Sequence, residues 1–186
     1  MATLESRGVS TGMAATNRQG RLNTADHAAF MAQCDGVFYA SWIAERAFEA
    51  GDIFEPLTSG AVHAAMCKAF RAASRDSRLA VLRAYPDLAG KLAIAGKLTE
   101  DSRREQAGAG LDRLSPEEHA EFTRLNGLYT SRFGFPFIMA VKGLDKHDIL
   151  TVFRDRIVNS VDEEFAAACE QVENIARLRL EARLPA

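Results

Sequence analysis

Apolar residues recur every three or four positions through most of the chain, the spacing that places them on one face of an α-helix. This spacing predicts helices over residues 23–35, 37–50, 59–73, 79–84, 102–110, 115–132, 145–157 and 161–183. No two segments show the strict alternation that is typical of paired β-strands. The sequence therefore predicts an all-α fold, a single-domain helical bundle of about eight helices over residues 22–186.

Capping residues mark where several of these helices begin. Three stretches fit the capping box, in which a hydroxyl and a carboxylate three residues later each accept a backbone N–H bond. They are Ser102 to Glu105, Ser115 to Glu118 and Ser160 to Glu163. Single caps are expected at Asn23 or Thr24, at Ser59 and at Asp145. The helix after Ser115 is expected to turn Phe122, Leu125, Leu128 and Tyr129 toward the core.

The helical pattern breaks in residues 133–141, which read FGFPFIMAV. Pro136 cannot continue a helix, because its ring fixes φ and removes an N–H donor, and Phe135 before it is pushed toward extended geometry. A short, apolar, non-helical segment is therefore predicted inside a helical protein. Its backbone N–H and C=O groups need partners. The segment is either a connector packed in the core or a wall that offers these groups to a polar ligand.

The composition is that of an ordinary globular protein, with 47% apolar and 26% charged residues. A formal net charge of −2 gives no general attraction to nucleic acid or to an anionic membrane, and no apolar run is long enough to span a bilayer. Residues 1–21 lack the apolar core of a signal peptide and are expected to form a flexible polar tail. The three scattered cysteines, with no CxxC spacing and no paired histidine, are expected to be reduced and buried in a cytoplasmic protein.

The last predicted helix carries an arginine on the line of its apolar face. Steps of four, three, four and three residues join Phe165, Cys169, Val172, Ala176 and Arg179. An arginine in this position either extends its head to water or turns inward to hold a carboxylate through two parallel hydrogen bonds. Arg156, which lies among apolar neighbours, is the second candidate for such a role.

A second cluster of polar groups lies on the helix predicted over residues 102–110. Ser102, Glu105 and Gln106 stand at i, i+3 and i+4, so a hydroxyl, a carboxylate and an amide face the same way. Ser102 and Glu105 have the alternative role of capping the helix. Gly108 and Gly110 each cost a helix about 1 kcal/mol relative to alanine, so a close approach of another element is expected there.

The sequence shows no pattern for a metal or a phosphate-bearing cofactor. None of the four histidines pairs with another at helical spacing, and no Cys/His cluster occurs, so a metal site is not expected. Phosphate-loop, dinucleotide and GxSxG patterns are also absent from the sequence. The residues alone indicate a helical protein with an anion-binding pocket.

Four segments resemble the OHCU decarboxylases, which act on 2-oxo-4-hydroxy-4-carboxy-5-ureidoimidazoline in uric acid breakdown. In chain order they are YPDLAG, LTEDSRREQAGAGLDRLS, LNGLYTSRFGFPFIMAVKG and IARLRL. The likeness runs from about residue 22 to residue 184 and is strongest over residues 82–143. It implies a helical bundle, usually a homodimer, that uses neither metal nor organic cofactor and forms (S)-allantoin and CO2. The implied partner is a small ureidoimidazoline, with no nucleic acid and no membrane.

The resemblance also implies roles for individual residues. Glu105 matches the family's acid–base carboxylate, while Ser102 and Gln106 match its substrate-binding positions. Arg179 matches the arginine on the carboxylate side of the substrate, and Pro86 lines the same pocket. The backbone that hydrogen-bonds the ring and the ureido group is matched by Phe137, Ile138, Met139, Ala140 and Val141.

One position departs from the family, whose motif begins with a histidine that is the principal proton donor. Here that position is Tyr85, whose side chain has a reference pKa of about 10, against about 6.5 for histidine. Three interpretations follow: Tyr85 is a weaker acid, the chain is a diverged or engineered form with little turnover, or His63 reaches the site from another helix.

The leading hypothesis is a cofactor-free decarboxylase in which Tyr85 impairs proton transfer. The rival hypothesis is a catalytically weak or inactive homologue that binds a ureide without transforming it. A third reading, a purely structural helical protein, leaves the match at Glu105, Gln106 and Arg179 to chance.

Overall fold

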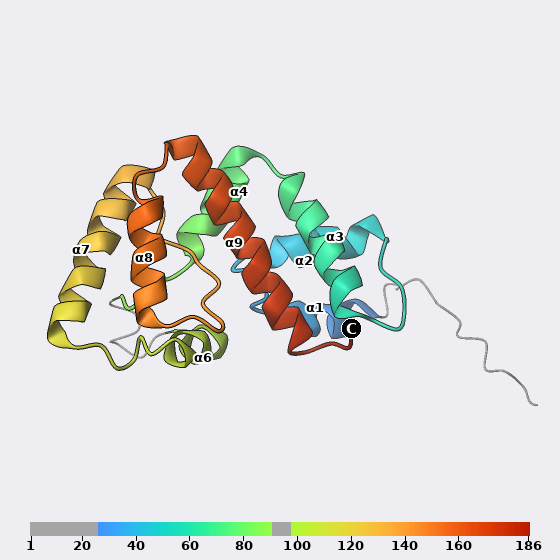
Figure 1. Cartoon of the computed structure of the whole chain (residues 1–186). Coiled ribbons are helices and arrows are strands. Elements are labelled where there is room, and N and C mark those ends of the chain that lie inside the picture. The colour runs from blue at the N-terminus through green and yellow to red at the C-terminus, as the bar shows by residue number, and fades with distance from the viewer. Residues whose placement is uncertain (1–25, 91–97) are drawn as a thin grey trace, which may run out of the picture.

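A computed structural model describes residues 26–90 and 98–186. Within these residues the chain forms eight α-helices and no β-strand, which confirms the all-α prediction (Figure 1). The helices are α1 (His27–Cys34), α2 (Ser41–Ala50), α3 (Ser59–Arg71), α4 (Arg75–Ala84), α6 (Glu100–Gly108), α7 (Pro116–Phe133), α8 (Lys146–Arg156) and α9 (Val161–Glu181). The predicted tail, residues 1–21, and the predicted caps Asn23 and Thr24 lie outside the described residues.

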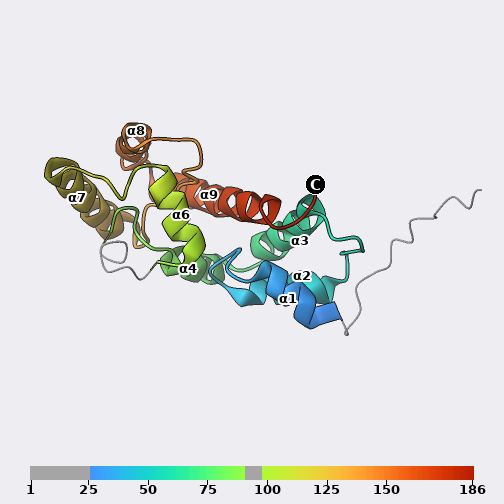
Figure 2. The same ribbon diagram turned by 90° about the horizontal axis from the view of Figure 1, so that it is seen from below.

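Helix α9 is the longest of these helices and runs through the middle of the molecule (Figure 1). It packs against α3, α4 and α7, while α1 packs on α2, α2 on α3 and α8 on α7. The view from below shows an elongated arrangement, with α7 and α8 toward one end and α1, α2 and α3 toward the other (Figure 2). Helix α6 lies between these groups (Figure 2) and is contacted by Arg179 of α9 and by Arg183, which lies just after α9.

Three of the predicted helix starts are confirmed. Ser115 and Ser160 each form a complete capping box with the glutamate three residues later. Asp145 forms a third box, because its side chain accepts the N–H of Asp148 while the Asp148 carboxylate accepts the N–H of Asp145. These helices begin where local sequence alone places them.

Two predicted caps are wrong by a few residues. Helix α3 is capped by Thr58, whose side chain accepts the N–H of Ala61, and Ser59 is already its first helical residue. Helix α6 is capped by Thr99, so the predicted capping box at Ser102 and Glu105 does not form. Because Thr99 supplies the cap, the Ser102 hydroxyl and the Glu105 carboxylate are left for tertiary contacts.

Two helix starts also differ from the apolar pattern. Helix α2 begins at Ser41 rather than near residue 37, since Val37 and Phe38 lie in the preceding turn and are buried from there. Helix α4 begins at Arg75, capped by Ser74, and is longer than the predicted segment 79–84. Burial of apolar side chains from a turn explains the first difference, and a local hydroxyl cap explains the second.

The predicted break after α7 is confirmed. Gly134 ends the helix with φ of 77°, a left-handed conformation that suits glycine, and residues 136–141 have no helical structure. Phe137 stacks on Phe153 of α8 with ring centroids 3.9 Å apart, and Tyr129 of α7 meets the edges of Phe135 and Phe137. The segment is buried against α7 and α8, which fixes a non-helical backbone beside α9.

Expectations for the surroundings of three other residues are wrong. Leu128, expected to face the core, is 49% exposed. A Cβ atom added at Gly108 or Gly110 would have no neighbour within 4 Å, so neither glycine marks a close approach. Gly110 instead has φ of 74°, which explains a glycine in the turn that follows α6.

The cysteines Cys34, Cys67 and Cys169 are free and buried, as predicted. The expectation that none has a histidine neighbour is wrong, since the Cys67 Sγ lies 3.1 Å from the His63 Nε2 one helical turn away. Burial raises the pKa of Cys34 and of Cys67 to about 12, so both thiols stay protonated at neutral pH. No helix in the described part of the chain is long and apolar enough to cross a membrane.

Candidate functional site

One small cavity between α6, α9 and the 136–141 segment gathers almost every residue expected at the site. Its lining includes Tyr85, Pro86, Ser102, Glu105, Gln106, Phe137, Ile138, Met139, Val141 and Arg179. Ala140 lines the adjoining, larger cavity instead. The inner cavity has a free volume of about 20 Å³, room for about one water molecule. A five-membered ring therefore enters only if side chains at its wall move.

Arg179 dominates this cavity, and its side chain is 3% exposed. Its Nε and Nη2 groups donate to the two carboxylate oxygens of Glu105, each over 2.8 Å. Nη1 donates to the carbonyl oxygen of Gly36 over 2.8 Å, and Nη2 donates to the Ser102 hydroxyl over 3.2 Å. Of the two orientations that its place on the apolar face of α9 allows, Arg179 thus adopts the inward one. The carboxylate that it binds is Glu105.

The guanidinium of Arg179 keeps its charge in this environment. Burial lowers its pKa, but the hydrogen bonds and the negative charge of Glu105 more than offset this, so that the pKa is raised overall. Four of its five N–H groups have acceptors, which leaves one N–H on Nη1 without a partner among the described residues. A ligand carboxylate that reaches Arg179 must use this N–H or displace Glu105.

The Ser102 hydroxyl belongs to a chain of hydroxyl groups. Tyr39 brings its hydroxyl to 2.6 Å from the Ser102 Oγ and to 3.1 Å from the Thr99 Oγ1. The Arg179 guanidinium lies over the Tyr39 ring, 5.5 Å from its centroid. Sequence reasoning missed Tyr39, because it stands 63 residues before Ser102 in a turn that carries no recognisable motif.

Tyr85 lies in the same cavity, at the end of α4. It is 7% exposed, its ring contacts the Tyr39 ring with centroids 4.6 Å apart, and its hydroxyl has no hydrogen-bond partner among the described residues. Burial raises the pKa of Tyr85 well above its ordinary value; the Arg179 charge opposes this shift, and Tyr39 and Glu105 add to it. The hydroxyl is therefore a hydrogen-bond donor at neutral pH and a poor exchanger of protons.

Gln106 fixes the loop that carries Tyr85 and Pro86. Its Oε1 accepts the backbone N–H of Ala89 over 3.0 Å, and the Asn126 side chain donates to the carbonyl of Leu88 over 2.9 Å. Ala89 has φ of 51°, an uncommon value for a residue other than glycine. The two side-chain amides hold this loop against α6 and α7.

Arg156, the second arginine candidate, supports the cavity wall from behind. Its Nη1 donates to the carbonyl of Ile138 over 2.8 Å, and its guanidinium lies over the Phe137 ring, 4.7 Å from the centroid. Its other donors bind Glu164, which is fully buried. Arg156 is not among the residues that line the inner cavity, so it orients the wall and has no direct access to a ligand there.

Residues 136–141, the wall segment, have one further contact with α9. The backbone N–H of Ala140 donates to the Gln171 Oε1 over 3.0 Å. This amide is therefore already occupied, whereas sequence reasoning counted every amide of residues 137–141 as free for a ligand.

One alternative from the sequence, a role for His63, is not supported by the geometry. The Nε2 of His63 lies 3.0 Å from the carbonyl oxygen of Glu173, and His63 is not part of the cavity lining, so it does not replace the missing histidine. Within residues 26–90 and 98–186, no group of three His, Cys, Asp or Glu side chains is arranged to hold a metal ion.

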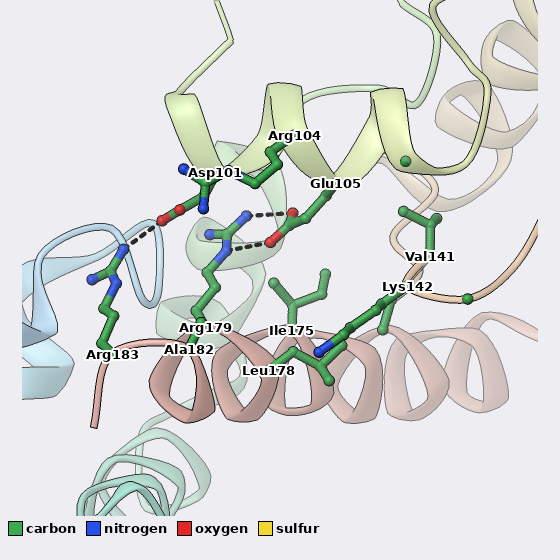
Figure 3. A pocket seen from close by; sticks show the side chains of 13 residues that line it. Asp101, Arg104, Glu105, Val141, Lys142, Ile175, Leu178, Arg179, Ala182 and Arg183 are labelled. Carbon is green, nitrogen blue, oxygen red and sulfur yellow. Dashed lines mark hydrogen bonds and ion pairs between the residues drawn. The ribbon is translucent and has the colours of Figure 1, made fainter. Parts of the chain in front are cut away.

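A second, outer cavity of about 450 Å³ adjoins the inner one (Figure 3). The two cavities share Glu105, Val141, Ile175 and Arg179. Figure 3 shows the Glu105–Arg179 pair between α6 and α9, with Lys142 reaching across α9 from the loop that follows the wall segment. The ion pair therefore stands between the inner cavity and the outer one.

A profile of the OHCU decarboxylase family matches residues 23–181. The chain belongs to the OHCU decarboxylase family. Within this family, a 2-oxo-4-hydroxy-4-carboxy-5-ureidoimidazoline decarboxylase of Halalkalicoccus jeotgali is 40% identical over 162 residues, which cover 86% of this chain and 88% of that protein.

Solved structures agree with this membership. The crystal structure of an (S)-allantoin synthase matches 85% of this chain and 50% of its own, with a TM-score of 0.66 and 28% identity. An OHCU decarboxylase crystallised in the presence of (S)-allantoin matches 78% of this chain and 92% of its own, with a TM-score of 0.63. Its identity of 22% supports the shared fold alone.

Proposed function

We propose that this chain decarboxylates 2-oxo-4-hydroxy-4-carboxy-5-ureidoimidazoline to (S)-allantoin and CO2 in uric acid degradation. The observation that carries the proposal is the meeting of Tyr85, Glu105 and Arg179 at one cavity, in a chain of the OHCU decarboxylase family. The relatives named above supply the substrate and the product.

The proposed reaction needs no cofactor, because the substrate's own ring accepts the electron pair. The carbon that bears the carboxylate also bears a hydroxyl and adjoins an imine carbon. Loss of CO2 breaks the carbon–carboxylate bond, a ring carbon–carbon double bond forms, and the imine nitrogen gains a proton. The resulting enol loses its hydroxyl proton, and the former imine carbon gains a proton on one face. One proton is consumed for each CO2 released.

The charged side chains have complementary roles in this scheme. Arg179 anchors the substrate carboxylate, using its remaining N–H and the contacts that Glu105 gives up. Glu105 is the acid–base group, because it is the carboxylate in the lining of the inner cavity. Tyr85 donates a hydrogen bond from its unpartnered hydroxyl and holds the ring in place without exchanging its own proton.

Polar groups around the cavity edge orient the ring. The backbone of residues 137–141 hydrogen-bonds the ring and the ureido group. Because the amide of Ala140 is occupied by Gln171, we assign these contacts to the other residues of the segment. Ser102 and the side-chain amide of Gln106 complete the polar lining, while Pro86 provides an apolar surface.

The test is direct measurement of turnover. The unstable substrate is generated enzymatically from urate, and (S)-allantoin is followed by circular dichroism. We expect the native chain to accelerate (S)-allantoin formation and the Glu105→Gln variant to lose that acceleration. Glu181→Gln, an exposed carboxylate on α9 that pairs with Arg177, is the control and retains activity. If neither the native chain nor a Tyr85→His variant accelerates the reaction, the proposed activity is wrong.

The second candidate function is a ureide-binding homologue without useful turnover. The observation that favours it is Tyr85, a buried phenol with a raised pKa where the family has its proton-donating histidine. Calorimetry that finds tight allantoin binding without turnover supports this alternative. Measurable turnover by the native chain eliminates it.

We also propose that the chain acts in the cytoplasm as a homodimer, as the family resemblance implies. Light scattering at micromolar concentration distinguishes a mass near twice 20.3 kDa from that of the single chain. Cell fractionation tests the location.

A further inference from the structure

The outer cavity carries an excess of positive charge, although the whole chain has a formal net charge of −2. The charged residues of its lining are the cations Arg104, Lys142, Arg179 and Arg183 and the carboxylates Asp101 and Glu105. Two of the cations are neutralised locally, because Arg179 pairs with Glu105 and Arg183 pairs with Asp101. The excess positive charge therefore belongs to Arg104 and Lys142.

Both of these side chains are available to an incoming anion. Lys142 makes no ion pair within the part of the chain that the structure describes, and it reaches across the cavity toward α9 (Figure 3). Arg104 is 68% exposed, and the nearest carboxylate oxygen, from Glu100, is 3.8 Å away. Glu100 is held more closely by Arg103, which does not line this cavity. Arg104 comes from α6 and Lys142 from the loop after the wall segment, so they flank the cavity from different elements.

We propose that Lys142 and Arg104 form an outer anion subsite that captures the substrate carboxylate before it reaches Arg179. This inference rests on the proposed function, in which the substrate is an anion and the products are the uncharged (S)-allantoin and CO2. A cationic entrance raises the local concentration of an anion and leaves a neutral molecule unaffected. The subsite therefore distinguishes substrate from product by charge, and a product that has lost its carboxylate is no longer retained.

The position of the subsite relative to the ion pair supports this order of events. Arg179 and Glu105 line both cavities, so an anion held by Lys142 lies on the outer side of the pair. The inner cavity is too small for the substrate as long as its wall stays closed. A carboxylate that waits in the outer cavity is placed to compete with Glu105 for the guanidinium.

The test compares Lys142→Gln and Arg104→Gln with Lys68→Gln. Lys68, on α3, is 71% exposed and lines neither cavity, so its variant changes the net charge equally. We expect each subsite variant to raise KM about 3- to 10-fold at low ionic strength with kcat unchanged, and the Lys68 variant to match the native chain. Because salt screens long-range attraction, the difference in KM between the native chain and the subsite variants should shrink between about 20 mM and about 500 mM salt.

Two binding measurements separate this inference from the proposed activity. Calorimetry with allantoate, an anionic ureide, should show weaker binding in the Lys142→Gln variant, whereas neutral allantoin should bind both proteins equally. This comparison needs no turnover. The inference is overturned if Lys142→Gln leaves KM, its salt dependence and allantoate binding unchanged, or if it weakens allantoin equally.

A steric variant checks the route. A side chain at Gly108 would enter open space in the outer cavity, and Gly108 has ordinary helical φ. Gly108→Leu should lower kcat/KM without lowering the melting temperature. Unchanged kcat/KM in a folded Gly108→Leu protein would show that the substrate does not pass through this cavity.

Discussion

The Tyr85→His variant places an imidazole where the structure holds a buried phenol. The Tyr85 hydroxyl has no hydrogen-bond partner among the described residues, and burial raises its pKa, so it retains its proton across the physiological range. An imidazole has a reference pKa of about 6.5 and exchanges protons readily near neutral pH. In this position it would share a cavity with Glu105, which favours its charged form, and with Arg179, which opposes it.

The expected gain follows from what a positioned acid contributes. General acid–base groups typically supply about 10²- to 10⁴-fold in rate, which corresponds to about 3–5 kcal/mol of barrier. The smaller ring leaves about 40 Å³ unfilled beside Tyr39, a loss of about 1 kcal/mol in folding free energy. The imidazole removes the unpartnered hydroxyl but brings two ring nitrogens of its own, so we count no net gain from polar groups. A loss of about 1 kcal/mol is small beside a typical folding free energy, so we expect the variant to fold.

The assay follows (S)-allantoin by circular dichroism across pH 5 to about 9, a range that brackets the imidazole pKa. We expect kcat for Tyr85→His to exceed the native value by about 100-fold or more. We also expect the pH profile of kcat to change slope near the imidazole pKa. Tyr85→Phe keeps the contact with the Tyr39 ring but removes the donor, and should lower kcat/KM about 10-fold. Equal kcat values for the native and Tyr85→His proteins, both folded, would refute the argument that proton exchange at this position limits turnover.

Three further outcomes are expected. Glu105→Gln leaves the Arg179 guanidinium buried without a carboxylate, and should lower the free energy of unfolding by about 3 kcal/mol in urea titrations; no change would mean that the ion pair contributes nothing. Arg156→Lys loses the bond to the Ile138 carbonyl and should raise KM about 5-fold with less effect on kcat, and an unchanged KM would exclude its orienting role. Burial raises the pKa of Cys34 to about 12, so the folded chain holds this proton while the unfolded thiol releases it near pH 9. Stability should therefore fall from about pH 9 to about pH 12, less so in Cys34→Ala, and thiol reagents should label Cys34 at pH 8 only after denaturation; rapid labelling of the native chain would contradict this.

The local sequence correctly predicted a helix start wherever the capping partners are close neighbours in the chain. The boxes at Ser115 and Ser160 form because both partners lie within one turn. Ser102 fits the same motif, but Thr99 stands three residues earlier and caps α6 first. To choose between these two hydroxyls, one must know which of them a distant side chain engages. For Ser102 that partner is Tyr39, far away in the chain.

The sequence predicted which residues line the site better than it predicted the contacts that those residues make. The position of Arg179 on the apolar face of the last helix made an inward orientation one of two possibilities. Its bidentate bond to Glu105 could not be predicted in the same way, because the two residues are 74 positions apart. Backbone groups released by Pro136 were likewise expected to remain free, yet Gln171 occupies one of them. Pairings of this kind depend on how α6, α9 and the wall segment pack, which no local pattern records.

The bond from Arg179 to the Gly36 carbonyl has a consequence for the amino-terminal helices. Arg183, which lies just after α9, binds the carbonyls of Gln33 and Asp35, so Arg179 and Arg183 together hold the turn that joins α1 to α2. Neither helix lines the inner cavity, yet a ligand that draws Arg179 away from Gly36 loosens this turn. Amide exchange in α1 and α2 then reports occupancy of a pocket that they never touch. A chain shortened past Gly36 would lose the carbonyl that orients the Arg179 guanidinium.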